Sequence, residues 1–546
     1  MKHLLLSAAA LLLARLAAPA QTIDQNAEKA LEAAKPAALE AHVRYLADDK
    51  LRGRLPGTLG YQLAVDYVTK QLQDNGVAPA GERGAYTQRV RLRRAFVEPG
   101  ATLRLQPAAG AAEALGLGQD ASFYPNPGQA EVRLENAPLV FVGYGISAPE
   151  LKYDDYAGQN VKGKVVVVTR QPARQFGDNE RLYFADVRTV LETAARHGAA
   201  GVLLAAPRAD AHLPDLSKGL VSALGPDGKV AVSRSYAPGS AQLVGSISAA
   251  TLQRLFAGAS QDTAQALSAL RGGRPASQAL AARLSAQYRS RYQEVDSYNV
   301  VGKIEGSDPL LRDTYVVHSA HLDHLGVGAP VEGDSIFNGA HDNATGVASV
   351  LEISRMYSKL RPKPRRSVLF VLVTGEEMGL IGSAYFARFP TVPAVALVAD
   401  VNTDMPTIIA PLLSVVPLGA DHSSLLGQVQ TAARYLKLAI EPDPEPTQNR
   451  FIRSDQYSFV VRGVPALHLK YGNRTADGQN NLAETVQKWR ARTYHKPQDN
   501  YVGGTFDWAA GVKYAQLNFL IGYLIAQNPV LPTWNKGDFF GARFGK

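Results

Sequence analysis

Apolar and polar positions alternate along this chain in blocks that predict strands and helices in turn. From residue 298 onward, short apolar runs typical of buried strands are separated by segments with apolar residues every three or four positions. The predicted strands are residues 299–304, 314–319, 367–373, 396–401 and 466–471, and the predicted helices are residues 344–359, 379–388, 422–436 and 505–527. This alternation predicts an α/β fold with a mixed, mostly parallel sheet covered by helices on both faces.

The start of the chain predicts further α/β structure. Residues 23–49 and 61–75 carry apolar side chains at helical spacing, and the second segment stops before Gly76, as helices commonly do. A turn-rich segment at residues 52–57 separates them, and residues 86–93 alternate like a strand. None of these residues forms a motif that predicts chemistry.

Between residues 115 and 286 the pattern changes to that of a second, smaller unit. Residues 139–145, 163–169 and 201–205 read as buried strands, residues 187–198 as a helix, and a further helix is expected from Thr251. A turn at residues 270–275 and a helix after it are expected to lead out of this unit. No cluster of His, Asp and Glu occurs in its sequence, so we expect no catalytic site there.

The first twenty residues predict an export signal. A short positive region at residues 1–3 precedes an apolar run at residues 4–14, and small residues at 18–20 allow cleavage after Ala20. The chain has no cysteine, which excludes disulfides, thiolate metal sites and a lipid-modified cysteine. We therefore expect a periplasmic or secreted protein without a stable membrane anchor.

The length of the chain and its net charge limit the classes of protein to which it can belong. The 546 residues are enough for more than one domain, and the apolar run at residues 517–525 is too short to span a bilayer. The net charge of +9 is scattered, without a basic tract interleaved with aromatic residues. Nucleic acid is therefore not an expected partner.

Histidines and acidic residues follow several of the predicted strands. The candidate metal ligands are His321, Asp342, Glu377, Asp404 and His495. Each has an ordinary alternative alone: Asp342 can be a helix N-cap, Asp404 a turn residue and His495 a loop histidine. Together they form a mixed nitrogen and oxygen donor set at strand ends, which suits zinc or a similar divalent ion. One carboxylate that bridges two ions would create a two-metal hydrolytic site.

Two adjacent acids, Glu376 and Glu377, follow the apolar strand at residues 367–373. Neighbouring carboxylates repel each other unless a cation or a shared proton compensates. One of the two can bind metal while the other accepts a proton from water.

These motifs resemble the di-zinc aminopeptidase family of the MH clan, which also contains glutamate carboxypeptidase and the transferrin receptor. The resemblance rests on SAHLDHLG, NGAHDNATGVA, TGEEMGLIGS, the turn at residues 402–405, SDQYSFVVRGVPALHL and TYHKPQD. Residues 115–289 resemble a protease-associated domain, inserted into a zinc peptidase domain formed by residues 21–114 and 290–546. The family implies the zinc-peptidase fold, two zinc ions and a peptide substrate with a free N-terminus.

The resemblance also implies a role for each candidate residue. Asp342 would bridge the metals, His321 and Asp404 would complete one site, and Glu377 and His495 would complete the other. Glu376 would be the general base, Asp323 would orient His321, and Tyr494 would steady the oxyanion. His318, His324 and His341 receive no role and are read as structural.

Two positions depart from the family pattern. The family more often has Asp at position 341 and His at position 456, where this chain has His341 and Gln456. Neither is a direct ligand in the family, so metal binding is still expected, while the tuning of the site and the substrate preference are open.

The leading hypothesis is an exported zinc aminopeptidase. A carboxypeptidase acting on acidic C-termini is the alternative within hydrolases, and it would need arginines facing the metals, for which Arg450, Arg453 and Arg474 are candidates. A catalytically inactive binding protein of the same architecture is the alternative from another class. All the expected ligands and the base are present, which favours an enzyme. The sequence leaves the oligomeric state open.

Overall fold

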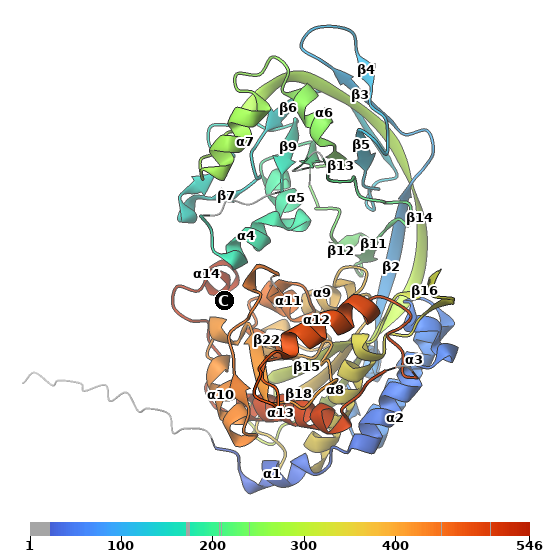
Figure 1. The fold of residues 1–546 in the computed structure, drawn as a ribbon, viewed down its shortest axis with the longest axis vertical. Coiled ribbons are helices and arrows are strands. Elements are labelled where there is room, and N and C mark those ends of the chain that lie inside the picture. Colours follow the sequence, from blue (N-terminus) through green and yellow to red (C-terminus); the bar gives the residue numbers. More distant parts are fainter. Residues whose placement is uncertain are drawn as a thin grey trace, which may run out of the picture.

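Two units stack along the long axis of the molecule and are joined along one side by two long strands (Figure 1). The computed structural model describes residues 22–545, apart from 171–174, 207, 209, 240, 449 and 503. The predicted export signal lies outside the described residues. The joining strands are β2 (Thr87–Val97) and β14 (Gln278–Ile304), which pair antiparallel.

The lower unit is built on the mixed, mostly parallel sheet that the sequence predicts. Its strand order is β14–β18–β15–β19–β22–β20–β21, in which β18, β15, β19 and β22 run parallel and β14 and β20 run against them. The strands are β15 (Tyr315–His321), β18 (Ser367–Val373), β19 (Leu397–Asn402), β20 (Ser414–Leu418), β21 (Ala439–Ile440) and β22 (Ala466–Tyr471). The short β1 (Ala78–Pro79) pairs with β14 at the edge.

Helices cover both faces of this sheet. One face carries α1 (Gln25–Leu31), α2 (Pro36–Leu46), α3 (Leu59–Asp74), α8 (Thr345–Lys359), α10 (Leu425–Tyr435) and α13 (Trp508–Gln527). The other face carries α9 (Ile381–Arg388) and α11 (Gln456–Val460). Successive residues of β18 enter the two cores in turn: Phe370 packs on the first face and Val371 on the second. This alternation of side chains is why β18 reads as a continuous apolar run.

The predicted strands and helices of the second half of the chain are confirmed to within three residues at each end, except that the strand predicted at residues 299–304 is the last part of the longer strand β14, which begins at Gln278. In the first half, the single helix expected at residues 23–49 is wrong, because α1 and α2 are separate. Pro36 is the first residue of α2, where a backbone N–H would have no partner within the helix, so a proline is favoured at this position. The strand β20 and the helix α12 (Leu482–Thr493) were not predicted.

The upper unit has its own α/β sheet. The strand order is β4–β3–β14–β6–β9–β10–β13–β5, and β6, β9, β10 and β13 run parallel. The strands are β3 (Thr102–Gln106), β4 (Glu113–Ala114), β5 (Ala121–Phe123), β6 (Glu131–Phe141), β9 (Val165–Thr169), β10 (Gly201–Ala205) and β13 (Leu243–Ile247). Its helices are α4 (Asp178–Ala185), α5 (Val187–Arg196), α6 (Ala249–Leu255) and α7 (Thr263–Arg271).

The helix expected after the turn at residues 270–275 is wrong, because β14 follows this turn. Side chains along its first half alternate between buried and exposed, with Leu280, Ala282 and Leu284 inside, as in a half-buried strand. The strand passes the predicted domain boundary at residues 289 and 290 without a break. Leu103 and Leu105, which precede residue 115, already belong to the core of the upper unit.

The two units also touch on the side away from the long strands. The C-terminal helix α14 (Phe539–Phe544) packs its Phe539 ring edge-on against Tyr183 of α4, with 5.6 Å between ring centroids. Arg543 Nε donates to the hydroxyl of Tyr183 at 2.8 Å. The small strands β11 (Leu220–Leu224) and β12 (Val230–Ser233) reach down to α9. The two units are therefore in contact both through the long strands and through α14 and α9.

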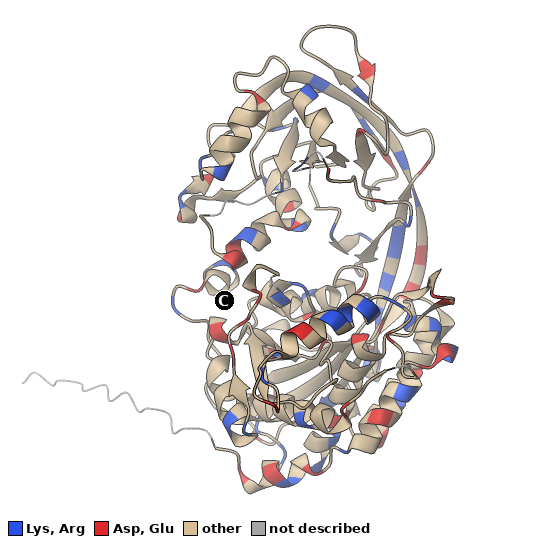
Figure 2. Cartoon of the chain, viewed as in Figure 1, with Lys and Arg blue, Asp and Glu red and all other residues tan. Residues whose placement is uncertain are grey.

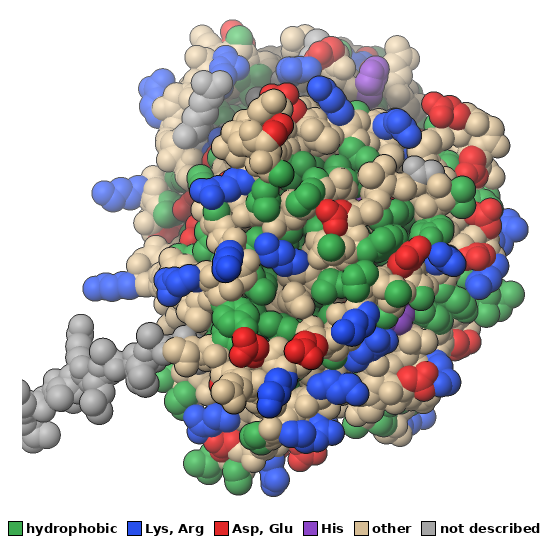
Figure 3. Space-filling model, turned by 60° about the horizontal axis from the view of Figure 1, so that its bottom comes forward, with side chains coloured by type: hydrophobic (Ala, Val, Ile, Leu, Met, Phe, Trp, Pro, Cys, Tyr) green, Lys and Arg blue, Asp and Glu red, His purple; other side chains and the backbone are tan. Residues whose placement is uncertain are grey.

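Charged residues are distributed over both units (Figure 2), and on the face in Figure 3 basic and acidic side chains are interspersed. Among the described residues, no helix has both the length and the apolar character that crossing a bilayer requires.

Candidate metal centre

The five candidate ligands meet at one edge of the lower sheet. His321 is the last residue of β15, Glu377 follows β18 and Asp404 follows β19. Because these strands are parallel, their carboxyl ends lie at the same edge. Asp342 comes from the loop before α8, and His495 from the loop after α12.

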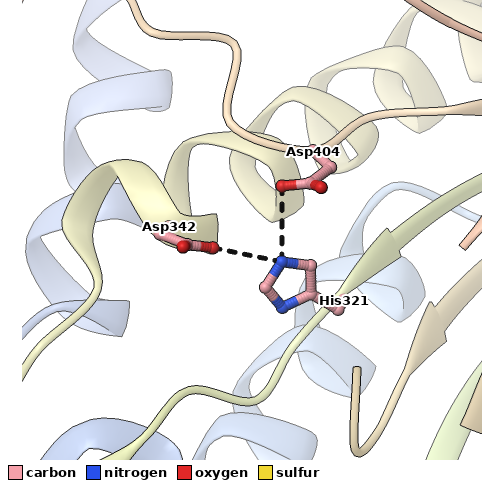
Figure 4. Close-up of side chains that lie close together, drawn as sticks. All are labelled: His321, Asp342 and Asp404. Atoms are coloured by element: carbon pink, nitrogen blue, oxygen red, sulfur yellow. Dashed lines mark ion pairs between the residues drawn. The ribbon is translucent and has the colours of Figure 1, made fainter. Parts of the chain in front are cut away.

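His321 is the centre of the first cluster (Figure 4). Its Nε2 lies 3.2 Å from Asp342 Oδ1 and 3.5 Å from Asp404 Oδ1. The His321 side chain is buried, while 14% of the Asp404 side chain is exposed, so the cluster is reached from the Asp404 side.

The second cluster uses the other oxygen of Asp342. His495 Nε2 lies 3.4 Å from Asp342 Oδ2 and 3.2 Å from Glu377 Oε2. The Asp342 carboxylate thus faces one histidine with each of its oxygens.

These separations fit zinc. Donors bound at about 2.0–2.2 Å in tetrahedral geometry lie about 3.3–3.6 Å from one another. The four distances between donors of different residues fall between 3.2 and 3.5 Å. The donor set, imidazole nitrogens with carboxylate oxygens, is also the one zinc accepts.

His324, read as structural from the sequence, lies in the second cluster. Its Nδ1 is 2.7 Å from Glu377 Oε1, and His324, Asp342 and Glu377 present donor atoms within 4.8 Å of one another. Both atoms of the close contact are buried, and neither makes a well-aligned hydrogen bond to any described residue. The HLDH spacing in the sequence was the available signal, since His324 follows His321 by three residues just after a buried strand.

Asp323 contacts both His321 and the loop that follows β18. Its carboxylate lies 4.0 Å from His321 Nδ1, beyond hydrogen-bond length, and His321 Nδ1 instead lies 3.1 Å from the Asp323 backbone carbonyl. The two carboxylate oxygens accept from the backbone N–H groups of Glu376 at 3.1 Å and Glu377 at 3.3 Å. Asp323 therefore positions the loop that carries both glutamates.

Arg54 holds two of the site loops together. Its buried guanidinium donates to the carbonyls of Leu322 at 2.9 Å, Asn338 at 2.5 Å and Gly339 at 3.1 Å, and also to that of Leu46. Burial lowers the pKa of Arg54 to about 10, against the opposing charge of Asp323. The segment around residues 52–57, in which the sequence showed no chemistry, thus anchors the loops before Asp323 and Asp342.

The loop before Asp342 is fixed at two further points. Gly339 has a φ of 59°, and a Cβ there would lie 2.0 Å from the carbonyl oxygen of Asp342. Asp499 accepts from the backbone N–H of His341 at 2.9 Å and from that of Asp342 at 3.0 Å. Gly339 and the buried carboxylate of Asp499 therefore fix the orientation of Asp342, the candidate ligand that both clusters share.

Glu376 and Tyr494 border the same site. Burial raises the pKa of Glu376 well above its ordinary value, against the charge of His321, and Glu377 raises it further. A carboxyl whose pKa is raised binds a proton more readily than an ordinary carboxyl, which suits a general base. The Tyr494 ring stacks on the His495 ring at 3.9 Å, and burial raises the pKa of Tyr494, so its hydroxyl stays protonated.

The two departures from the family pattern have structural partners. The His341 ring stacks on Phe506, with 4.5 Å between centroids, and its Nδ1 lies 3.3 Å from Asp499. Gln456 accepts from Asn402 Nδ2 at 2.7 Å. His318 packs in the core with its Nε2 3.3 Å from the Tyr357 hydroxyl.

Comparison with known proteins identifies related sequences. Residues 299–518 match the family model Peptidase family M28. A probable zinc metalloprotease of Pyrenophora teres f. teres (strain 0-1) is 34% identical over 112 residues, 20% of this chain and 23% of the relative. Aminopeptidase NAALADL1 of Rattus norvegicus is 38% identical over 104 residues, 18% of this chain and 12% of the relative. The chain thus spans less than a quarter of the length of these curated relatives.

Among solved structures, an aminopeptidase from Aneurinibacillus sp. strain AM-1 aligns with 92% of this chain and 95% of its own, at a TM-score of 0.48 and 18% identity. A zinc aminopeptidase from Bacillus subtilis aligns with 90% of this chain and 95% of its own, at a TM-score of 0.40 and 16% identity.

Proposed function

Because residues 299–518 match the model of Peptidase family M28, we propose that the chain is an exported di-zinc aminopeptidase. The observation that carries the two-metal part is the position of Asp342. Its Oδ1 faces His321 and its Oδ2 faces His495, so one carboxylate serves two clusters of donors. A shared carboxylate is the arrangement that a two-metal hydrolytic site needs.

The residues divide into two ligand sets. His321, Asp342 and Asp404 would hold one zinc ion, and His495, Asp342 and Glu377 would hold the other. Zinc bound there would supply Lewis acidity, which lowers the pKa of water and polarises the scissile carbonyl.

The proton transfers are assigned to Glu376. Its raised pKa suits a group that accepts a proton from the attacking water and gives it to the leaving amine. Asp323 keeps Glu376 beside the clusters through the backbone hydrogen bond at 3.1 Å. Tyr494, stacked on His495, would donate from its hydroxyl to the oxyanion that forms at the substrate carbonyl.

The end of the peptide that is bound follows from the charge of the cleft. Asp404 and Glu376 border the site, and such acids favour the free ammonium of a substrate over a terminal carboxylate close to the reacting bond. An ammonium is desolvated at an acceptable cost only where it finds charged acceptors.

The upper unit resembles a protease-associated domain in sequence, and we assign it the role of a cap over the cleft. Arg234, in the loop after β12, lies against Gly379, two residues beyond Glu377. The upper unit therefore reaches the loop that carries the base, which would limit the size of the substrate.

The proposal is tested with a peptide in three forms: free, N-acetylated and C-terminally amidated. If the chain is an aminopeptidase, N-acetylation should abolish cleavage. A buried charged hydrogen bond is worth about 1.5–3 kcal/mol, and the substrate ammonium would make more than one such bond. Amidation of the C-terminus should change the rate little. Equal rates for the free and acetylated forms would rule out an aminopeptidase, and dependence on a free C-terminus would establish the carboxypeptidase.

A further inference from the structure

A pocket of about 360 Å³ borders the metal centre beside α12 and the end of β22. Its wall includes Tyr494, the neighbour and stacking partner of His495. It also includes Lys470, whose Nζ donates to the backbone carbonyl of Asp404 at 2.7 Å. A substrate group in this pocket would therefore lie beside two residues, Tyr494 and Lys470, that contact the ligands His495 and Asp404.

The charged residues of the wall are mainly basic. Arg450, Lys470 and Arg490 line the pocket together with one acid, Glu445. Arg450 is already paired with Glu445 and lies 3.6 Å from Asp443. Basic positions follow one another along α12, the helix that carries Arg490 (Figure 2).

Two of these cations have no carboxylate partner. Within the described part of the chain, neither Lys470 nor Arg490 forms an ion pair. The Arg490 guanidinium instead lies over the Tyr494 ring, 4.3 Å from its centroid, and Lys470 binds a neutral carbonyl. Burial lowers the pKa of Lys470 to about 8, and against the attraction of Asp404 the charges of Arg490 and Arg450 lower it further. The three positive charges therefore lie close enough to repel one another.

We propose that this pocket, called the anion pocket below, binds a carboxylate of the substrate. The inference rests on the proposed aminopeptidase function, under which the carboxylate is the side chain of an N-terminal glutamate or aspartate. A second source of the same chemistry is the C-terminal carboxylate of a very short peptide.

Physical reasons favour a carboxylate over other occupants. A basic side chain would add a positive charge to a wall with three of them. An apolar side chain would displace water from Lys470 and Arg490 without supplying a negative charge, which is costly for desolvated cations. A carboxylate would compensate both cations. The apolar part of the wall, such as Val486 and Tyr471, is suited to the aliphatic stem of a glutamate.

The test compares pairs of substrates that differ only in a carboxylate. Glutamyl-anilide and glutaminyl-anilide have nearly the same shape. The ratio of their kcat/KM values therefore measures the effect of the negative charge on the side chain. Alanyl-alanine and its amide measure the C-terminal carboxylate in the same way. We expect the zinc-loaded enzyme to favour the glutamyl over the glutaminyl anilide by about tenfold or more.

Arg490→Gln tests the pocket, and Arg492→Gln is its matched control. Both remove one arginine charge from the same helix, but Arg492 is exposed and does not line the pocket. We expect Arg490→Gln to reduce the glutamyl-to-glutaminyl ratio by about tenfold. Arg492→Gln should change the ratio by less than about twofold, as expected of an exposed charge.

Binding without turnover gives a second measurement. Calorimetry on the zinc-loaded enzyme should show tighter binding of L-glutamate than of L-glutamine, and Arg490→Gln should remove the difference. If both carboxylate pairs have equal kcat/KM and the two amino acids bind equally, the inference is overturned. A preference for alanyl-alanine over its amide that Arg490→Gln removes would keep the anion pocket and assign the C-terminal carboxylate to it.

Failure of the proposed function has a different readout. Alanyl-anilide carries a free amine and no carboxylate. If it is cleaved but the glutamyl form is not favoured, the aminopeptidase stands and the anion pocket does not. If N-acetylated peptides are cleaved as fast as free ones, the aminopeptidase itself fails, and the calorimetric comparison still decides whether the pocket binds a carboxylate.

Discussion

His324 Nδ1 lies 2.7 Å from Glu377 Oε1, while His495 Nε2 lies 3.2 Å from the other oxygen of the same carboxylate. Glu377 therefore stands between two histidines, one buried behind it and one at the mouth of the site. The sequence gives these histidines very different contexts, since one follows β15 and the other follows α12.

This contact predicts that His324 contributes to zinc affinity. His324→Ala should weaken binding of the zinc ion held by Glu377 by about 10–100-fold, as loss of a residue that orients a ligand does. Titration of the metal-free protein with zinc measures the effect, and the exposed His212→Ala is the control. Unchanged affinity in His324→Ala would show that the contact has no role in metal binding.

Metal content is the second prediction. Because Asp342 faces one histidine with each oxygen, the purified protein should contain about two equivalents of zinc. Removal of the metal by a chelator should abolish hydrolysis, and zinc should restore it. Full activity in a protein that elemental analysis finds free of divalent metal would contradict the proposed site.

The third prediction separates the two adjacent glutamates. Glu376→Gln should keep the zinc content and lower kcat by at least about 10²–10⁴-fold, the range of general acid–base catalysis. Glu377→Ala should instead lower the zinc content, since Glu377 is the residue beside His495. The reverse pattern, an emptied site in Glu376→Gln only, would exchange the two assignments.

Local patterns were sufficient to predict the parallel strands of the lower sheet and the shared edge at which His321, Glu377 and Asp404 lie. Runs such as β18 are apolar throughout because both of their faces are buried, and ligands that follow parallel strands must share an edge. The anion pocket is different. Its cations come from a short 3-10 helix (Arg450–Ile452), from β22 and from α12, and only the tertiary fold brings them together.

Of the three arginines considered from the sequence, only Arg450 lines that pocket. Arg453 is exposed, and Arg474 lies 3.7 Å from Glu441. Lys470 lies in a predicted strand that carries no predicted site residue, and Arg490 lies on a helix that the sequence pattern did not predict. The spacing of Leu482, Val486 and Trp489 at intervals of three and four residues was the available signal for that helix.

Acid sensitivity is the fourth prediction. Burial lowers the pKa of His318 to about 3, whereas an unfolded histidine titrates near 6.5. The unfolded chain therefore binds more protons below pH 6.5, and the unfolding free energy falls by about 1.4 kcal/mol per pH unit as the pH decreases toward 3.

His318→Gln removes this titration. Between pH 7 and pH 5 the variant should lose about 2 kcal/mol less unfolding free energy than the unaltered protein, measured by chemical denaturation at both pH values. The exposed His212→Gln should behave like the unaltered protein. An equal loss in His318→Gln would show that His318 is protonated in the folded state.

The last prediction concerns Arg54, which joins the N-terminal segment to the site from a distance of more than 260 residues in sequence. Its guanidinium serves four carbonyls, among them those of Leu322 and Gly339 in the two ligand loops. Arg54→Met keeps a long apolar stem but leaves these buried carbonyls without a donor, so it should lower the unfolding free energy by about 3 kcal/mol or more. It should also weaken zinc binding, because the loops before Asp323 and Asp342 lose their common anchor.

Arg52→Met, at an exposed position two residues away, is the control and should change the unfolding free energy by less than about 0.5 kcal/mol. Chemical denaturation and zinc titration of both variants measure the two effects. If Arg54→Met lost stability but bound zinc normally, Arg54 would support the fold without positioning the ligands.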